Sequence, residues 1–152
     1  MIKFSQILVP VSGLEIEDQA IRLACEIARR DKAKVLAVNV MEIERALPLD
    51  VEQDAQIQRA EQILDHAQKT AKVVGVAIET DLLQSRVAGP ALVDEANERR
   101  VDLIVVGLPF RKRLDAFHMG ATTTYILKNA ASAVWLCREA APADKKPGAE
   151  GI

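Results

Sequence analysis

Short apolar runs alternate along this chain with segments in which apolar residues recur at every third or fourth position. The runs predict five strands, because four to eight apolar or alternating residues between turn signals are typical of a strand in a sheet. The clearest run, Leu103-Ile104-Val105-Val106, has no polar side and suits a strand buried on both faces of a parallel sheet. The predicted strands cover residues 7–11, 35–40, 76–83, 103–106 and 133–137.

The segments between the runs predict four helices. In residues 14–30 the apolar side chains recur three and four positions apart, so that they share one face of a helix. Gly89-Pro90 opens the third helix, since proline is well placed in a first turn. Small and hydroxyl residues after Gly120 indicate the start of the last helix. The predicted helices cover residues 14–30, 51–73 and 89–100, and the last one ends near Ala130.

The order of these elements predicts an α/β fold with one five-stranded parallel, doubly wound sheet. Strands that alternate with helices are joined by right-handed crossovers, which place helices on both faces of the sheet. The mixed pattern of residues 76–83 favours an edge strand, and residues 41–51 form a long connection. We expect residues 1–138 to form this domain. Residues 139–152 are rich in Ala, Pro, Lys and Gly and are expected to form a disordered tail.

Composition narrows the classes of function. The chain has 152 residues, of which 49% are hydrophobic and 28% charged, as in soluble single-domain proteins. A net charge of −2 and few aromatic side chains (one Trp, one Tyr and three Phe) argue against a nucleic-acid partner. No apolar run approaches the roughly 20 residues that span a bilayer, and the first residues lead into a strand pattern rather than a signal peptide. We therefore expect a cytoplasmic protein with no membrane and no nucleic-acid partner.

Cysteine and histidine give no sign of a metal site or a catalytic site. Cys25 and Cys137 lie in apolar segments and are predicted to be buried thiols, because their spacing fits neither metal ligands nor a redox pair. His66 lies among polar residues and is expected to face solvent, whereas His118 lies near the predicted ligand site. No nucleophile can be paired with a base, and the turn after the first strand lacks the second glycine and the Asp-Ser of the ATP pyrophosphatase loop. We expect no metal and no catalysis.

The stretch 102–124 combines a buried strand, a basic loop and a helix start. The N–H groups of a helix start are unpaired and partly positive, so that phosphate binds there. Arg111, Lys112 and Arg113 add positive charge in the loop. In a doubly wound fold, ligands bind beyond the carboxyl ends of the strands, where the strand order reverses. The residues alone leave two interpretations open: an anion site, or an ordinary strand-to-helix connection with a solvated basic loop.

Four segments, in this order and at this spacing, resemble the universal stress protein family over about residues 3–138. They are ILVPVSG, VNVME, ALVDEANERRVDLIVVG and GATTTYILKNAASAVWLC. The resemblance implies a five-stranded doubly wound sheet of the adenine nucleotide alpha-hydrolase-like kind. It also implies a homodimer through the last strand. From the residues alone, either a second copy or the tail or a helix of the same chain covers the apolar edge of this strand.

Nucleotide-binding members of that family carry a loop of the pattern G-x2-G-x9-G-[ST] and an aspartate at the end of strand one. Gly107 and Gly120 match the first and last glycines, but Phe110 replaces the middle glycine, Ala121 the following Ser or Thr, and Ser12 the aspartate. A side chain at position 110 is expected to obstruct the approach of backbone to phosphate. Alanine lacks a hydroxyl donor, and serine lacks the charge of a carboxylate that hydrogen-bonds a ribose hydroxyl.

The strand ends and the resemblance together mark a nucleotide site, in which Val40 matches a position that lines the adenine pocket. The candidate residues are Pro10, Val11, Ser12, Val40, Val106, Gly107, Phe110, Arg111, Gly120, Ala121, Thr122 and Thr123. The resemblance implies a non-catalytic regulatory module with a degenerate nucleotide loop and an unidentified protein partner. The alternative is a stress sensor that binds ATP or AMP through residues 107–122. A slow ATP-hydrolysing enzyme is the third hypothesis.

Overall fold

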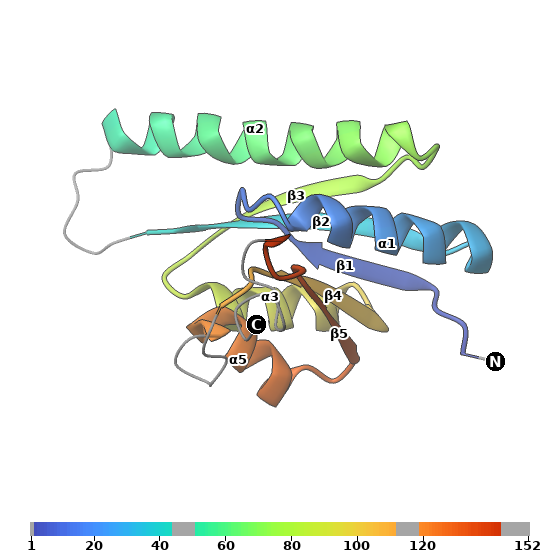
Figure 1. Ribbon diagram of the computed structural model, residues 1–152. Helices are drawn as coiled ribbons and strands as arrows, with labels where there is room; N and C mark the ends of the chain where they lie inside the picture. Colours follow the sequence, from blue (N-terminus) through green and yellow to red (C-terminus); the bar gives the residue numbers. More distant parts are fainter. Residues whose placement is uncertain (1, 44–50, 112–118, 144–152) are drawn as a thin grey trace, which may run out of the picture.

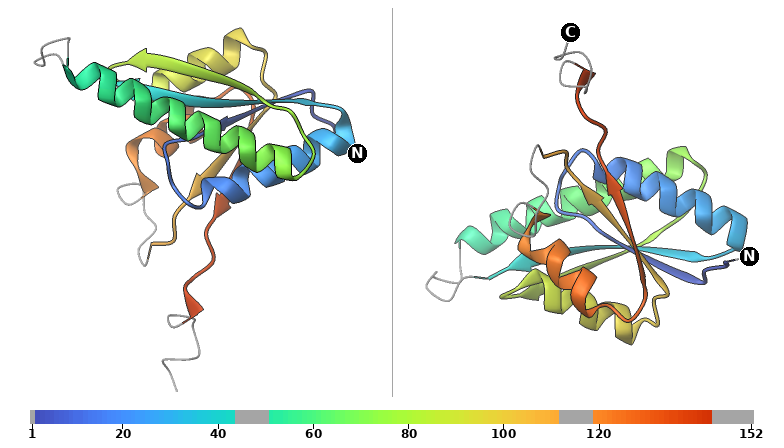
Figure 2. Two further views of the ribbon diagram at one scale, coloured as in Figure 1. Left: turned by 90° about the horizontal axis from the view of Figure 1, so that it is seen from above. Right: turned by 60° about the horizontal axis from the view of Figure 1, so that its bottom comes forward.

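The computed structural model describes residues 2–43, 51–111 and 119–143, which form a parallel sheet between two layers of helices (Figure 1). The strands are β1 (Gln6–Pro10), β2 (Lys34–Glu42), β3 (Glu79–Ser85), β4 (Leu103–Leu108) and β5 (Ala133–Arg138). The helices are α1 (Glu17–Asp31), α2 (Val51–Val73), α3 (Ala88–Glu98) and α5 (Ala121–Asn129). Figure 2 shows from two further sides that α1 and α2 cover one face of the sheet and α3 and α5 the other.

Alternate side chains of the central strands feed two apolar cores, one on each face. Ile7 and Val9 of β1 pack with residues of α1 and α2, whereas Leu8 packs with residues of α3 and α5. All residues of β4 are buried, so its apolar run needs no polar side. The cores and the parallel pairing confirm the predicted doubly wound fold.

The neighbouring strands β1 and β4 separate toward their carboxyl ends. The strand order is β3-β2-β1-β4-β5, so the order reverses between these two strands, where ligands of such sheets bind. β1 pairs with β2 from Gln6 to Pro10, but its pairing with β4 ends at Leu8, opposite Ile104. Beyond this point the two strands are no longer paired, and their carboxyl ends flank a crevice.

Two predicted boundaries differ from the structure by three residues. α1 begins at Glu17 and not at residue 14, because residues 14–16 form a tighter turn, in which the N–H groups of Glu17 and Asp18 donate to carbonyls three residues back. β3 begins at Glu79 and not at residue 76, because the N–H of Val76 donates to the carbonyl of Ala71 and ends α2. β3 is an edge strand, as predicted. The long connection after residue 43, Lys112, Arg113, His118 and the tail from residue 144 lie outside the described residues.

A buried carboxylate anchors the segment that leads into β1. Asp31, the last residue of α1, accepts a hydrogen bond from the N–H of Phe4 at 2.9 Å and pairs with Arg30 at 2.7 Å. The hydrogen bond from Arg30, followed by that from Phe4, lowers the pKa of Asp31 from 3.8 to about 2. A carboxyl whose pKa falls on folding stabilises the fold in its ionised form.

Asp31 therefore gives the stability of the fold a measurable pH dependence. Its contribution is complete above its unfolded pKa of 3.8 and is lost as the pH falls through about 2. Asp31→Asn is expected to lower stability at neutral pH and to reduce the further loss between about pH 4 and pH 2. Urea unfolding midpoints across this range measure the effect. Asp65→Asn, at an exposed position of α2, is the control. If Asp31→Asn loses stability with acid as steeply as wild type, this role of Asp31 is wrong.

Candidate functional site at the carboxyl ends of the strands

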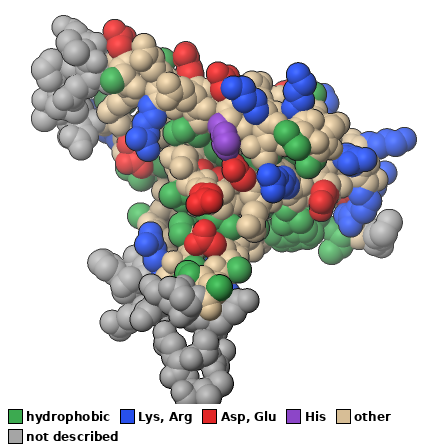
Figure 3. Space-filling model, turned by 45° about the horizontal axis from the view of Figure 1, so that its top comes forward, with side chains coloured by type: hydrophobic (Ala, Val, Ile, Leu, Met, Phe, Trp, Pro, Cys, Tyr) green, Lys and Arg blue, Asp and Glu red, His purple; other side chains and the backbone are tan. Residues whose placement is uncertain are grey.

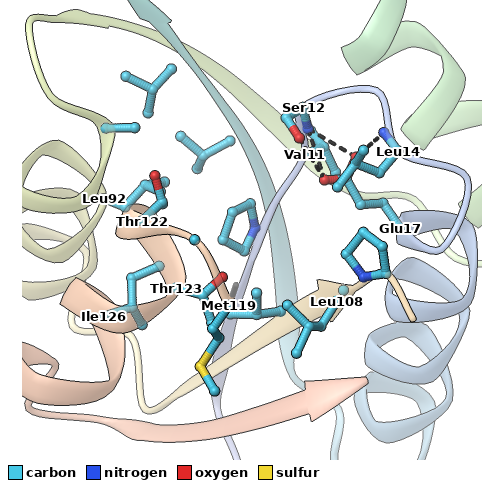
Figure 4. A pocket seen from close by; sticks show the side chains of 18 of the residues that line it. Val11, Ser12, Leu14, Glu17, Leu92, Leu108, Met119, Thr122, Thr123 and Ile126 are labelled. Carbon is cyan, nitrogen blue, oxygen red and sulfur yellow. Dashed lines mark hydrogen bonds between the residues drawn. The ribbon is translucent and has the colours of Figure 1, made fainter. Parts of the chain in front are cut away.

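A cavity of about 410 Å³ lies where β1 and β4 separate (Figure 4). Its walls come from the carboxyl ends of β1, β2 and β4 and from the starts of α1, α3 and α5. Ten of the predicted candidate residues line it: Pro10, Val11, Ser12, Val40, Val106, Gly107, Arg111, Gly120, Thr122 and Thr123. The fold thus brings together residues that are more than 100 positions apart in the sequence.

Two candidate residues, Phe110 and Ala121, are not part of the lining. The ring of Phe110 lies against the guanidinium group of Arg138, with 5.3 Å between the guanidinium carbon and the ring centroid. Its N–H donates to Glu139 Oε1 at 3.4 Å. The side chain that the sequence places in the path of phosphate is therefore directed toward the end of β5 and not into the cavity.

Glu17 is the residue of the site that the sequence analysis missed. Its carboxylate is buried, with 7% of the residue exposed, and lies under the turn that follows β1. Glu17 Oε1 accepts hydrogen bonds from the N–H groups of Ser12, Gly13 and Leu14, each at 2.9 Å. Glu17 Oε2 accepts a bond from Ser12 Oγ at 3.0 Å. Figure 4 draws this network beside the cavity.

A weak sequence signal for Glu17 existed. A glutamate that accepts a bond from the N–H three residues before it is the acidic half of a capping box. The other half requires Ser or Thr at position 14, where this chain has leucine. Without that partner, Glu17 is indistinguishable from Glu15 and Asp18, which are acidic residues at an ordinary helix start.

Gly107 lies against the backbone of Glu17. A Cβ atom at position 107 would meet the Cα, Cγ and N atoms of Glu17 at 3.3 Å, closer than ordinary van der Waals contact. The glycine lets the first turn of α1 approach β4 inside the crevice. This packing gives Gly107 a structural role that is independent of any phosphate.

The opposite side of the cavity is suited to an anion. α5 begins after Gly120, which has a φ of +95° and makes no side-chain cap, and Thr122 and Thr123 lie in its first turn. Free N–H groups of a first turn and the positive end of the helix dipole attract phosphate. The guanidinium-bearing Arg111 lines the same cavity.

The part of the lining that comes from β2 and α3 is mostly apolar. It includes Val38, Val40 and Leu92, and Figure 4 shows Leu92 across the cavity from Ser12. Glu42, at the end of β2, accepts a hydrogen bond from the N–H of Ala88 at 3.2 Å and closes this wall at the start of α3. A cavity with an apolar wall and a few convergent polar groups is typical of small-molecule sites.

A second hollow, of about 560 Å³, lies between α1 and α2. His66 Nε2 lies 2.8 Å from Asp18 Oδ1 at its rim, and the imidazole (purple in Figure 3) is exposed, as predicted. Arg59, Asp18 and Glu15 all line this hollow, so its walls carry charges of both signs.

The two cysteines differ in burial. Burial raises the pKa of Cys25 to about 11, and this thiol is buried as predicted, whereas Cys137 is only half-buried. In the described ranges, no three His, Cys, Asp or Glu side chains are grouped as metal ligands. None of the helices in that part of the chain combines the length and apolarity that crossing a membrane requires.

Comparison with known proteins places the chain in a family. The sequence model of the universal stress protein family matches residues 3–138. Universal stress protein MJ0531 of Methanocaldococcus jannaschii is 26% identical over 133 residues, which are 84% of this chain and 78% of that protein. The solved structure of a universal stress protein from Archaeoglobus fulgidus is also 26% identical, and the match, with a TM-score of 0.71, covers 88% of this chain and 93% of that one. A structure from Archaeoglobus fulgidus in complex with dAMP matches at 21% identity and a TM-score of 0.71 over 89% of this chain and 98% of that one. The chain belongs to the universal stress protein family, as its motifs indicate.

Proposed function

We propose that this protein is a non-catalytic regulatory module that binds an adenine nucleotide in the cavity between β1 and β4. The observation that carries the proposal is the position of Phe110. Its ring lies against Arg138, outside a cavity that ten predicted site residues line. The volume of about 410 Å³ falls in the range of about 300–1,000 Å³ that is typical of ligand pockets. Because the Phe110 ring leaves this cavity open, the structure favours a site that binds a nucleotide over a degenerate site that binds none.

The charges around the cavity favour AMP over ATP. Glu17 and Glu42 place two carboxylates in the lining, against one guanidinium group from Arg111 among the described residues. Ala121 supplies no hydroxyl at the start of α5. Among the described residues, each phosphate added to the ligand therefore gains few donors and faces more repulsion. The relative from Archaeoglobus fulgidus that was solved in complex with dAMP, a deoxyadenosine monophosphate, supports a monophosphate as the ligand.

The polar groups of the cavity favour binding over catalysis. Both oxygens of Glu17 already accept hydrogen bonds, so this carboxylate is poorly placed to act as a general base. The Cys25 thiol is buried, and its raised pKa keeps it protonated. We propose that a change in nucleotide occupancy regulates an unidentified protein partner in the cytoplasm. Phosphate release above background from ATP would contradict the non-catalytic part, and recovery of the protein from a membrane fraction would contradict the location.

The exposed edge of β5 supports a homodimer. β3, at the other edge, carries Glu79 and Asp81, which pair with Arg99, and such charges discourage pairing between sheets. β5 instead exposes Trp135 and Leu136, by 37% and 39%. A second copy that pairs along β5 would cover this apolar edge.

A thermal-shift titration tests nucleotide binding. A ligand that binds only the folded state stabilises it by about 2.7 kcal/mol at 100 times its dissociation constant, which raises the melting temperature of a domain of this size by about 5–10 °C. We expect AMP to produce such a shift at sub-millimolar concentration and ATP to produce a smaller one. No shift with AMP, ADP or ATP would contradict the proposal.

A pair of glycine variants locates the bound nucleotide. Gly120 and Gly75 both have a positive φ, +95° and +81°, and both have open space where a Cβ would lie. Valine at either position is expected to strain the backbone by about 1–3 kcal/mol, because both glycines have a φ that side chains rarely adopt. Gly75 lies before the amino end of the edge strand β3, whereas the cavity lies at the carboxyl ends of the central strands. The AMP shift should therefore disappear in Gly120→Val and persist in Gly75→Val, and its persistence in both would place the ligand elsewhere.

A further inference from the structure

The first three residues of the turn after β1, Ser12, Gly13 and Leu14, already direct their hydrogen-bond donors to Glu17. The N–H groups of Ser12, Gly13 and Leu14 all donate to Glu17 Oε1, each at 2.9 Å. The hydroxyl of Ser12 donates its proton to Glu17 Oε2 at 3.0 Å. A turn of this kind would otherwise present its N–H groups to an anion. In this chain a side chain of the protein already occupies that place.

The Ser12 hydroxyl is consequently restricted to the role of acceptor. A hydroxyl has one proton and two acceptor lone pairs, and here the proton is committed to Glu17. Ser12 lines the cavity, so the lone pairs are what it can offer to a ligand. The bond to a carboxylate polarises the oxygen further, because hydrogen bonds in a chain strengthen one another. A ligand group at this corner must therefore be a donor, and a phosphate oxygen is excluded.

Glu17 is held in this arrangement by its surroundings. The residue is 7% exposed, and its backbone packs against Gly107 of β4, where a Cβ atom would come within 3.3 Å. The carboxylate cannot turn away without leaving three N–H groups and one hydroxyl without their acceptor. The acceptor role of Ser12 is thus fixed before any ligand arrives.

The cavity therefore has two chemically different ends. Arg111 and the first turn of α5 after Gly120 attract an anion, whereas the corner of Ser12 and Glu17 accepts only donors. The donors of an adenosine monophosphate are the amino group of the base and the hydroxyl groups of the ribose. The base requires apolar walls, which β2 and α3 provide through Val40 and Leu92. The ribose links the base to the phosphate, so its hydroxyl groups are the donors that remain for Ser12.

We infer that Glu17 is a positioning residue that makes Ser12 Oγ an acceptor for a ribose hydroxyl. This pair then selects ribonucleotides over nucleotides whose sugar lacks the 2′ and 3′ hydroxyl groups. The inference rests on the proposed binding of adenosine monophosphate. Nucleotide-binding members of the family carry an aspartate at the position of Ser12. In this chain the carboxylate of Glu17 reaches the same turn from α1 and acts through the Ser12 hydroxyl.

The test compares the binding of AMP and of 2′,3′-dideoxy-AMP by calorimetry. One hydrogen bond to a polarised acceptor corresponds to about a tenfold difference in affinity. Wild type is expected to prefer AMP by this factor. Ser12→Ala should bind both ligands equally, whereas Ser12→Thr, which keeps the hydroxyl, should retain the preference. Glu17→Gln should reduce the preference, because an amide has a single acceptor oxygen and no longer fixes the hydroxyl proton.

The outcomes separate this inference from the proposed function. If wild type binds both ligands with equal affinity, the role of Ser12 and Glu17 is wrong, but nucleotide binding stands. If Ser12→Ala retains the wild-type preference, the acceptor lies elsewhere and the inference is overturned. If wild type binds neither ligand, both the proposed function and this inference fail. Circular dichroism identifies a Glu17→Gln variant that does not fold, and the Ser12 variants decide the question in that case.

Discussion

Replacing Gly107 by valine is expected to lower the free energy of unfolding by about 1–3 kcal/mol, the usual cost of forcing extra methyl groups into a well-packed site. The new side chain would meet the backbone of Glu17, because even a Cβ atom comes within 3.3 Å of its N and Cα atoms. Relief requires the first turn of α1 to move away from β4. The movement would pull Glu17 from the turn at Ser12, so AMP binding should weaken together with stability.

The sign of the stability change in Gly107→Val distinguishes a close contact with Glu17 from the intrinsic strand preference of the new residue. Valine is favoured over glycine in strands, so a strand position without a close neighbour would gain stability from the same change. Gly107→Ala adds only the Cβ atom and should fall between wild type and Gly107→Val. Urea unfolding of the three proteins measures the order. A Gly107→Val protein as stable as wild type would mean that α1 does not press on β4 as described.

The second large effect is expected at the edge of β5. Leu136 is 39% exposed and belongs to neither apolar core, so Leu136→Lys should leave the fold of the protomer intact. In a dimer paired along β5 the lysine would face apolar surface, which weakens association by at least about tenfold. Trp135 is less suitable for this test, because its ring packs edge-on against Phe4 at 5.4 Å.

Sedimentation velocity measures the oligomeric state of wild type and of the variants directly. Wild type is expected to be a dimer at micromolar concentration and Leu136→Lys a monomer. Val73→Lys, at a position 82% exposed at the end of α2, introduces the same charge away from β5 and should remain dimeric. A monomeric wild type would contradict the dimer, and a dimeric Leu136→Lys would move the interface away from this edge.

The fold was predictable because its central strands are apolar on both sides. In β4, Leu103 and Val105 pack with one core and Ile104 and Val106 with the other, so the sequence is apolar throughout and its pattern has one interpretation. The start of α1 was not predictable from periodicity. Ile16 continues the apolar pattern and has helical backbone angles, but the backbone hydrogen bonds of residues 14–18 span three residues, so a tight turn precedes the α-helix.

The site was predictable where it depends on strand ends, and not where it depends on the direction of side chains. Ser12, Val40 and Gly107 follow from the rule that ligands bind beyond the carboxyl ends of parallel strands. The direction of the Phe110 ring depends on Arg138, which is 28 positions away and pairs with β4 only in the folded sheet. The role of Glu17 depends on three backbone N–H groups, which a sequence does not display.

The central claim is that the cavity between β1 and β4 binds a nucleotide although the middle glycine of the loop is missing. Calorimetric titration of AMP into wild type and into Phe110→Gly tests it most directly, because the substitution restores the glycine of the family pattern. Since the ring already lies against Arg138 and outside the cavity, we predict that both proteins bind AMP with affinities within about threefold of each other. Binding by Phe110→Gly alone would show that the ring closes the cavity in solution, and binding by neither would show that the cavity is not a nucleotide site.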